Sequence, residues 1–225
     1  MLTMPISIII PVLNEEKNIE ILLQQLQEIR QEGNEVIVVD GGSIDDTVSI
    51  AKMFSDKVIK SKSGRALQMN SGASVAAHDA LWFLHADTLI PDTAMKNIQQ
   101  VLNKNDWGRF DIRLSGSNFL FRIIERLINI RSCLTGIATG DQAIIVKKNV
   151  FDAVEGYPAI PLMEDIELSY KLRKISKPIC IKNPLITSSR RWEKNGIFST
   201  ILLMWRLRFL YWFGVSAEKL ASQYK

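Results

Sequence analysis

The sequence is short of cysteine, with only Cys133 and Cys180 among its 225 residues. Two cysteines cannot form a disulfide framework, and this pair lies too far apart for a Cys-x-x-Cys metal or redox motif. We expect each to be a buried, small apolar residue in a protein of a reducing compartment. The content of 47% hydrophobic and 23% charged residues is typical of a globular protein and excludes a disordered or collagen-like chain.

The sequence also lacks a clear transmembrane segment. The longest apolar run, residues 197–215, is interrupted by Arg206 and Arg208, whereas a spanning helix needs about 20 residues with few charges. The apolar run at residues 6–12 contains Pro11 and does not resemble a secretory signal. We therefore expect a cytoplasmic protein, or one at the cytoplasmic face of the membrane.

Excess positive charge is absent from most of the chain. Residues 189–225 carry seven Lys or Arg against two Glu, whereas the remainder has slightly more acidic than basic residues. We therefore expect no nucleic-acid partner for the body of the protein. Residues 198–213 are apolar nearly all round, so they predict a buried helix. This basic, hydrophobic tail predicts either a peripheral membrane contact or a homodimer interface, and the sequence does not decide between them.

Alternating strand and helix patterns fill the first half of the chain. Apolar runs predict strands at residues 6–12, 35–39, 57–60 and 80–84, and the first of these runs is β-branched. Helical spacing of apolar residues predicts helices between and after them, at residues 19–29, 64–77 and 91–102. This order indicates an α/β fold with a mainly parallel sheet and helices on both faces. Ligands bind beyond the carboxyl ends of such strands, where Asn14, Asp40 and Asp87 occur.

The second half predicts further strands at residues 109–114, 141–146 and 177–182. It predicts an amphipathic helix at 118–131 that packs on the body, and helices at 149–153 and 164–174. We divide the chain into a catalytic domain, 1–188, and the helical tail, 189–225. Within the domain, residues 1–107 form the expected nucleotide-binding half and residues 108–188 the expected acceptor-binding half.

The usual dinucleotide and P-loop fingerprints are absent, so the sheet must bind its ligand by another scheme. Four segments in order carry a different signature: SIIIPVLNE at 7–15, VVDGGSIDDT at 38–47, FLHAD at 83–87 and MEDIEL at 163–168. Together they resemble family 2 glycosyltransferases, and GRALQMNSG at 64–72 resembles a small bacterial subgroup of that family. The resemblance implies a GT-A-type, Rossmann-like fold. It also implies inverting transfer of a sugar from a nucleotide-diphosphate donor, such as a UDP- or GDP-sugar, to a hydroxyl acceptor.

The resemblance assigns roles to particular residues. Asp165 is the expected general base, with Glu164 positioning the acceptor, and Asp87 is the expected ligand of a divalent metal, Mn²⁺ or Mg²⁺, on the diphosphate. Asp40 is expected to read the nucleobase. The remaining residues expected to bind the nucleotide sugar are Pro11, Asn14, Glu15, Gly42, Ser43, Arg65, His85, Ala86 and Arg191.

Three departures from the family pattern qualify this reading. His85 stands where the first acid of an Asp-x-Asp motif is usual, and Gly41 replaces a second acid after Asp40. Ser188 stands where processive synthases have glutamine before Arg-Trp, which argues for a non-processive enzyme. The alternative is a catalytically degenerate module that binds a nucleotide or a protein. The hydrophobic tail makes a lipid-linked acceptor plausible on composition alone.

Overall fold

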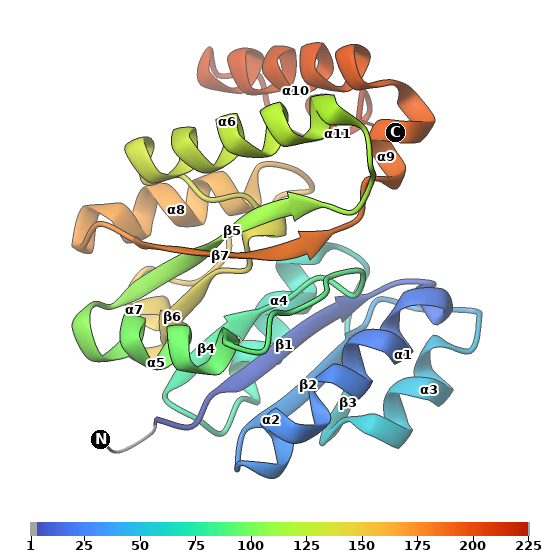
Figure 1. Cartoon of the computed structure of the whole chain (residues 1–225), viewed down its shortest axis with the longest axis vertical. Helices are drawn as coiled ribbons and strands as arrows, with labels where there is room; N and C mark the ends of the chain where they lie inside the picture. Colours follow the sequence, from blue (N-terminus) through green and yellow to red (C-terminus); the bar gives the residue numbers. More distant parts are fainter. Residues whose placement is uncertain (1–3, 225) are drawn as a thin grey trace.

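The computed structural model describes residues 4–224, so the last residue of the expected tail, 225, lies outside the described part. A sheet with the strand order β3-β2-β1-β4-β6-β5-β7 runs through the molecule (Figure 1). Only β6 is antiparallel to its neighbours. The strands are β1 Ser7–Val12, β2 Glu35–Asp40, β3 Lys57–Lys60, β4 Ala80–Phe83, β5 Trp107–Leu114, β6 Ile145–Lys147 and β7 Ile179–Thr187. The expected α/β architecture with a mixed, mainly parallel sheet is confirmed.

Helices cover both faces of this sheet. They are α1 Glu16–Gln25, α2 Gln27–Gln31, α3 Thr47–Phe54, α4 Arg65–Ser74, α5 Ala94–Lys104, α6 Phe119–Thr135, α7 Lys148–Ala153, α8 Glu164–Ile175, α9 Arg190–Asn195, α10 Ile197–Trp212 and α11 Ala217–Ala221, with a 3₁₀ turn η1 at Gly140–Gln142. None of the helices in residues 4–224 is both long enough and apolar enough to cross a bilayer.

Alternation along the strands sends neighbouring side chains into two different cores. Ile8 and Ile10 of β1 pack with α1, α3 and α5 on one face, whereas Ile9 packs with α4, α7 and α8 on the other. A strand covered on both faces reads as a continuous apolar run. This is why β1, β2 and β4 were predictable from their apolar runs.

The second half departs from expectation at its strands. The strand predicted at 141–146 begins only at Ile145, because Thr139 and Gln142 form a capping box around η1 and Ala143 adopts a left-handed φ of 45°. The strand predicted at 177–182 instead runs over Ile179–Thr187. It includes Pro184, which a strand tolerates at the edge of a sheet, where β7 lies.

Two side-chain environments bear on expectations about burial. Helix α10 buries only Thr200 and Leu207, and Trp205 and Trp212 are 71% and 75% exposed, so the body of the protein does not cover this helix, and its burial in a dimer or bilayer interface stays a prediction. Cys133, at the end of α6, and Cys180, in β7, are not separate buried residues, because they form a disulfide with each other. Neither side chain is fully enclosed.

Candidate active site

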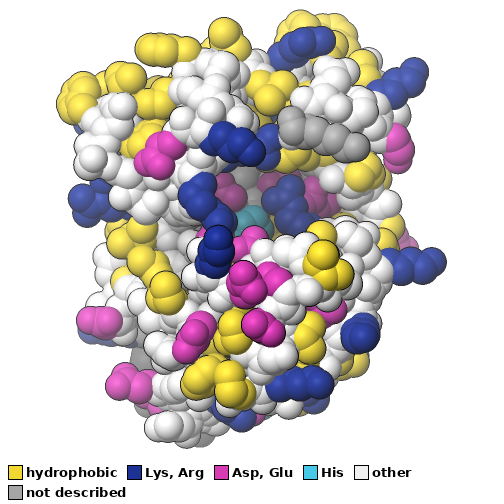
Figure 2. Space-filling model, turned by 90° about the vertical axis from the view of Figure 1, so that its right-hand side faces the viewer, with side chains coloured by type: hydrophobic (Ala, Val, Ile, Leu, Met, Phe, Trp, Pro, Cys, Tyr) yellow, Lys and Arg dark blue, Asp and Glu magenta, His cyan; other side chains and the backbone are white. Residues whose placement is uncertain are grey.

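A cavity of about 470 Å³ opens beyond the carboxyl ends of β1 and β4. Figure 2 looks into this hollow, with a histidine inside it and Lys, Arg and acidic side chains gathered around it. These two strands are neighbours in the sheet but their connections run in opposite directions along it, and such a switch point is where α/β sheets bind ligands. The lining residues are Pro11, Val12, Leu13, Glu15, Ser63, Gly64, Arg65, Gln68, His85, Ala86, Asp87 and Arg191.

Seven of the residues expected from the sequence therefore line one cavity: Pro11, Glu15, Arg65, His85, Ala86, Asp87 and Arg191. The other nucleotide-loop residues lie beside it. The backbone N–H of Asn14 donates to Ser43 Oγ at 2.9 Å, and the N–H of Ile44 donates to Asn14 Oδ1 at 2.9 Å. Gly42 turns the chain with a φ of 103°. These residues join the loops after β1 and β2.

Asp40 lies at the end of β2 and is only 2% exposed. Its Oδ1 accepts a hydrogen bond from the N–H of Ser43 at 2.9 Å. This bond orders the turn after β2. The expected reading of a nucleobase by Asp40 stays a prediction.

Gln68 is a site residue that sequence reasoning missed. Its amide Nε2 donates to the carbonyl oxygens of Val12 and Val39, each at 2.8 Å, and so connects the ends of β1 and β2. A Cβ at Gly41 would lie 3.1 Å from this amide. Gly41, which replaces the usual acid, therefore leaves space for the side chain of Gln68. The two residues are distant in sequence, so only the structure shows this contact.

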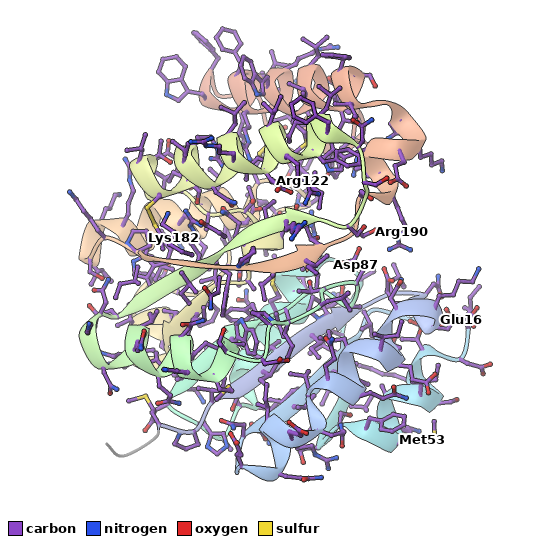
Figure 3. All side chains as sticks on the ribbon, viewed as in Figure 1. Glu16, Met53, Asp87, Arg122, Lys182 and Arg190 are labelled. Atoms are coloured by element: carbon purple, nitrogen blue, oxygen red, sulfur yellow. A yellow bond between two sulfur atoms is a disulfide. The ribbon has the colours of Figure 1, made fainter. Side chains whose placement is uncertain are left out.

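Asp87, the expected metal ligand, follows β4 and pairs with an arginine that the sequence did not single out. Arg190 Nη2 lies 3.2 Å from Asp87 Oδ2 and 3.8 Å from Glu15 Oε2. Figure 3 shows Arg190 and Asp87 on the same side of the molecule, beyond the strand ends. Arg190 and Asp87 are 103 residues apart in the sequence, so no local pattern links them.

The carboxylates suit a metal that shares its ligands with a phosphate. No group of three or more His, Cys, Asp or Glu side chains that could enclose an ion is found in residues 4–224. Mg²⁺ is commonly held by one or two carboxylates together with substrate phosphates and water. The donor set at Asp87 fits a metal of this kind and does not fit a structural metal held by protein side chains alone.

His85 is held between backbone and carboxylate. Its Nδ1 lies 3.6 Å from Asp141 Oδ1, and a Cβ at Gly140 would lie 2.8 Å from its Cε1 and Nε2 atoms. Gly140 therefore allows the ring to lie directly against the chain. Gly140 and Asp141 were missed as site residues because residues 141–146 were interpreted as a strand. In the sequence, Thr139 and Gln142 have the spacing of a capping box, and this could have predicted a turn at Gly140 and Asp141.

The expected catalytic acids begin α8, in the acceptor half. Glu164 is 3% exposed, and its Oε1 lies 3.1 Å from Arg65 Nε. Burial raises the pKa of Glu164, an effect that the charge of Arg65 opposes and that of Asp165 reinforces. This contact joins the first residue of α8 to Arg65 in the wall of the cavity.

Asp165 is tied to the backbone. Its Oδ2 accepts from the N–H of Gly140 at 2.8 Å, and its Oδ1 accepts from its own helix at Ile166 N, also at 2.8 Å. Met163, just before the helix, has a left-handed φ of 70°, and backbone of this kind is often found at functional sites. The turn η1, which carries His85's partner Asp141, therefore also orients Asp165.

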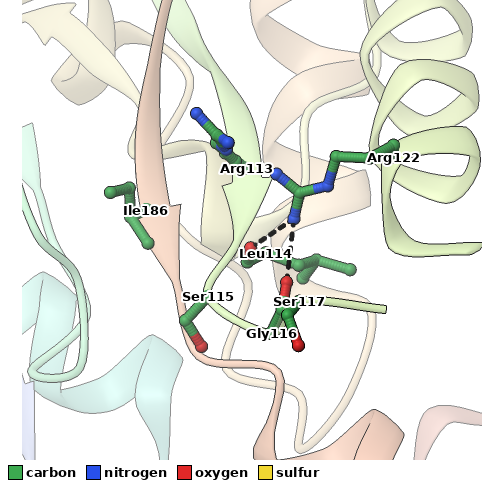
Figure 4. Close-up of a pocket in the computed structure, with 7 residues that line it drawn as sticks. All are labelled: Arg113, Leu114, Ser115, Gly116, Ser117, Arg122 and Ile186. Atoms are coloured by element: carbon green, nitrogen blue, oxygen red, sulfur yellow. Dashed lines mark hydrogen bonds between the residues drawn. The ribbon is translucent and has the colours of Figure 1, made fainter. Parts of the chain in front are cut away.

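A second cavity of about 380 Å³, drawn in Figure 4, is lined by Arg113, Leu114, Ser115, Gly116, Ser117, Arg122 and Ile186. Arg122 Nη2 donates to the carbonyl oxygens of Leu114 and Gly116, at 2.7 and 3.1 Å. The same nitrogen lies 3.3 Å from Glu125 Oε2, so the backbone and Glu125 share this guanidinium. The lining holds no acid or histidine, so this cavity offers no general base.

Comparison with known proteins agrees with this geometry. The sequence profile of a family described as "Glycosyl transferase family 2" matches residues 7–145. Among solved structures, the chain is similar to residues 1–349 of S. aureus TarS, at 18% identity and a TM-score of 0.66, over 83% of this chain and 61% of that one.

Two further solved structures are similar in fold. The mannosyltransferase PcManGT from Pyrobaculum calidifontis, solved with GDP-Man and Mn²⁺, is 20% identical with a TM-score of 0.62, over 84% of this chain and 57% of that one. Glucosyl-3-phosphoglycerate synthase from Mycobacterium tuberculosis, solved with Mn²⁺, UDP and glucosyl-3-phosphoglycerate, is 16% identical with a TM-score of 0.63, over 88% and 76%. The chain spans only 61% and 57% of the TarS and PcManGT chains.

Proposed function

This chain belongs to glycosyltransferase family 2, and we propose that it is an inverting, non-processive glycosyltransferase. It would move a sugar from a nucleotide-diphosphate donor to a hydroxyl acceptor. The observation that carries this proposal is the cavity at the ends of β1 and β4, whose wall is joined through Arg65 to the carboxylates that begin α8. We propose residues 1–107 as the donor half and residues 108–188 as the acceptor half.

The donor would be a UDP- or GDP-sugar with its diphosphate beside Asp87. PcManGT was solved with GDP-Man and Mn²⁺, and glucosyl-3-phosphoglycerate synthase with UDP and Mn²⁺. Asp87 would hold the metal, which when bound neutralises charge on the diphosphate. Arg65 and Arg191 line the same cavity and would contact the diphosphate as cationic donors.

Asp165 would act as the general base. In an inverting transfer the acceptor hydroxyl oxygen attacks the anomeric carbon as the bond to the diphosphate breaks. The carboxylate takes the hydroxyl proton during that attack. The hydrogen bonds from Gly140 N and Ile166 N hold the Asp165 side chain in one orientation. Glu164, fixed by Arg65, would position the acceptor.

The decisive experiment compares Asp165→Asn with Glu164→Gln and with the surface control Glu20→Gln. Donor turnover is measured with a panel of UDP- and GDP-sugars, and NMR of the product gives the configuration at the anomeric carbon. We expect Asp165→Asn to lose at least about a hundredfold in kcat while donor affinity stays unchanged, because general-base catalysis contributes roughly 10²–10⁴-fold. Glu20→Gln should retain full activity.

Full activity of Asp165→Asn would remove Asp165 from the base role. A retained anomeric configuration would contradict inversion, and long polymeric products would contradict non-processive transfer. Binding of the nucleotide without turnover of any sugar would favour a catalytically degenerate module.

We propose further that the protein binds the anionic, cytoplasmic surface of a membrane. Helices α6 and α10 pack against each other and carry exposed apolar stripes: Phe119, Ile123, Leu127, Ile130 and Leu134 on α6, and Phe198, Leu202, Trp205, Phe209 and Trp212 on α10. Figure 2 shows hydrophobic side chains gathered at this end of the molecule. Aromatic and aliphatic side chains beside an excess of Lys and Arg are typical of helices that lie in an anionic lipid interface.

A further inference from the structure

The arginines in and beside the donor cavity differ in what holds them. Arg65 and Arg190 each pair with a carboxylate, which neutralises part of their charge. Arg191 also lines the cavity, but it forms no ion pair with a side chain of residues 4–224. Within that part of the chain, its positive charge is therefore not spent on a neighbouring carboxylate.

Arg191 is held instead by Tyr224, which lies 33 residues further along the chain. Arg191 Nη2 donates to the backbone carbonyl oxygen of Tyr224 at 2.6 Å. The Cζ atom of the same guanidinium lies over the Tyr224 ring, 3.5 Å from its centre. The face of an aromatic ring attracts a cation without carrying a formal charge of its own. Tyr224 therefore holds this guanidinium at two places through uncharged groups.

Tyr224 is itself fixed by packing. It contacts the apolar cluster that joins the start of α8 to α10 and α11 and that includes Met163, Ile166 and Leu220. Met163 and Ile166 flank the acids at the start of α8, so Tyr224 lies between those acids and the donor cavity. Burial raises the pKa of the Tyr224 hydroxyl, and the nearby charge of Arg191 opposes that rise. The ring is thus a firm support for the arginine.

The orientation of Arg191 matters for an anion in the cavity. A guanidinium presents a planar fork of N–H donors that matches the oxygen atoms of a phosphate only at suitable angles. A long side chain that is already ordered loses less rotamer freedom when the anion binds, so binding is tighter. A carboxylate in the place of Tyr224 would also order the guanidinium, but it would compete with the diphosphate for its charge. An aromatic ring and a carbonyl oxygen order it without that competition.

We propose that Tyr224 is a positioning residue for donor binding, whose ring and carbonyl oxygen hold Arg191 in the orientation that meets the diphosphate. This inference rests on the proposed function and deepens it. It extends the donor site to the segment that follows α11, far in sequence from the four motif segments at 7–15, 38–47, 83–87 and 163–168. Tyr224 acts through Arg191 and needs no contact with the donor itself.

The test separates the aromatic face of Tyr224 from its hydroxyl and from its apolar bulk. UDP, GDP and inorganic pyrophosphate are titrated by calorimetry with Mn²⁺ present. Tyr224→Phe keeps the aromatic face and should bind these anions as tightly as the wild type does. Tyr224→Leu keeps apolar packing but has no aromatic face, so we expect it to lose about fivefold in affinity. A role in packing alone predicts instead that the leucine variant binds like the wild type.

The matched control is Tyr170→Leu, which removes a similar contact elsewhere. Arg173 Cζ lies 4.6 Å from the centre of the Tyr170 ring on α8, and neither residue lines the donor cavity. This control should bind all three anions with unchanged affinity. Thermal unfolding verifies that each variant is folded, and Tyr224→Met, which also lacks an aromatic face, serves if Tyr224→Leu is not.

A double-mutant cycle shows whether Tyr224 acts through Arg191. Arg191→Met should lose about tenfold or more in affinity for the anions. Adding Tyr224→Leu to this variant should weaken binding no further, because the ring then has no guanidinium to hold. With a sugar donor that the wild type turns over, Tyr224→Leu should raise the donor KM and change kcat little, which is the opposite of the effect expected for Asp165→Asn.

Equal affinity of Tyr224→Leu and the wild type would overturn the proposal, as would additive losses in the double variant. If the wild type turns over a nucleotide sugar and Tyr224→Leu does so with an unchanged KM, the proposed function stands and the role of Tyr224 falls. If pyrophosphate binds with the expected variant effects but no nucleotide binds, the proposed donor falls and the role of Tyr224 at an anion site stands. A wild type that binds none of the three anions would overturn both.

Discussion

At the scale of single residues, Glu35 shows how one carboxylate connects three parts of the sheet. It lies at the start of β2, with Ser7 Oγ donating to its Oε2 at 2.7 Å and the N–H of Ala77 donating to the same atom at 2.9 Å. Lys57 Nζ lies 2.6 Å from Oε1. Burial alone would raise the pKa of Glu35, but these partners hold it below its ordinary value of 4.5.

The lowered pKa of Glu35 predicts a pH-dependent contribution to stability. A carboxyl whose pKa is lower in the folded state stabilises the fold above its unfolded pKa, here 4.5, and loses that contribution as the pH falls through its folded pKa. Because the side chain of Lys57 is 40% exposed and glutamine can still accept hydrogen bonds, Glu35→Gln should reduce the free energy of unfolding by about 1 kcal/mol at pH 7. The difference from wild type should shrink below pH 4.5. Urea unfolding across this pH range measures it, and a constant difference would contradict the linkage.

The residues that sequence reasoning found and missed differ in a physical way. Asp87, Glu15 and Arg65 lie in motifs at strand or helix ends, so local pattern was enough to bring them to one cavity. Gln68, Asp141 and Arg190 act through contacts with residues that are distant in sequence. No periodicity or spacing encodes such contacts, so only the fold could identify these residues.

At the scale of elements, α6 uses side chains to complete a strand. Asn129 accepts from the N–H of Ile112 and donates to its carbonyl oxygen, both at 2.9 Å, while Glu125 accepts from the N–H of Leu114 at 3.0 Å. Strand β6 pairs with β5 only at Trp107 and Gly108. The polar stripe of α6 thus satisfies backbone groups of β5 that have no neighbouring strand on that side.

Replacing Asn129 should show how much stability the protein loses when these backbone groups of β5 have no hydrogen-bond partner. Asn129→Leu leaves the N–H and carbonyl of Ile112 without partners, and a buried unsatisfied donor costs roughly 1–3 kcal/mol. We expect a loss of about 2 kcal/mol in the free energy of unfolding by urea titration. Arg126→Leu, at an exposed position of the same helix, is the matched control and should change it little. Equal stability of the two variants would show that water replaces the amide at no cost.

The disulfide between α6 and β7 gives a second prediction at this scale. Cys133 and Cys180 are 47 residues apart, and closing a loop of this length stabilises a fold by roughly 4 kcal/mol, chiefly by restricting the unfolded chain. Reducing agent should therefore lower the Tm of the wild type. The Cys180→Ser variant should already unfold at the lower temperature and should not respond to the reductant. A wild type that is equally stable before and after reduction would contradict this role.

The elements of the first half were predictable because β1, β2 and β4 are buried on both faces and are therefore mostly apolar along their length. In the second half, β6 is only three residues long and β7 contains a proline, so strand propensity was a poor guide. The apolar composition of α10 predicted that the helix contacts another apolar surface. The sequence could not show how much of that surface the body itself supplies.

At the scale of the whole molecule, the apolar end formed by α6 and α10 predicts binding to anionic vesicles. The wild type should float with phosphatidylglycerol vesicles and much less with phosphatidylcholine vesicles, and high salt should weaken this binding. Trp205→Glu with Phe209→Glu should abolish flotation. Met53→Glu is the control, because Met53 is 64% exposed on α3, which Figure 3 shows far from α10.

Light scattering on the same proteins separates a membrane surface from a dimer interface. A wild type that is monomeric without lipid supports the membrane proposal. A wild-type dimer that Trp205→Glu dissociates, with no flotation of either protein, would contradict it and assign the stripes to a second copy of the chain.

The polar stripe of α6 also bears on how this protein avoids aggregation. A strand with free N–H and carbonyl groups can recruit a strand from another molecule, and β5 is protected from this by Asn129 and Glu125. The two outer strands are guarded differently: β3 is four residues long and begins and ends in lysine, and β7 carries Pro184 and the exposed Lys182. The sheet therefore offers little template for strand addition. A protein with a large apolar end can then stay monomeric in solution until that end binds the membrane surface we propose for it.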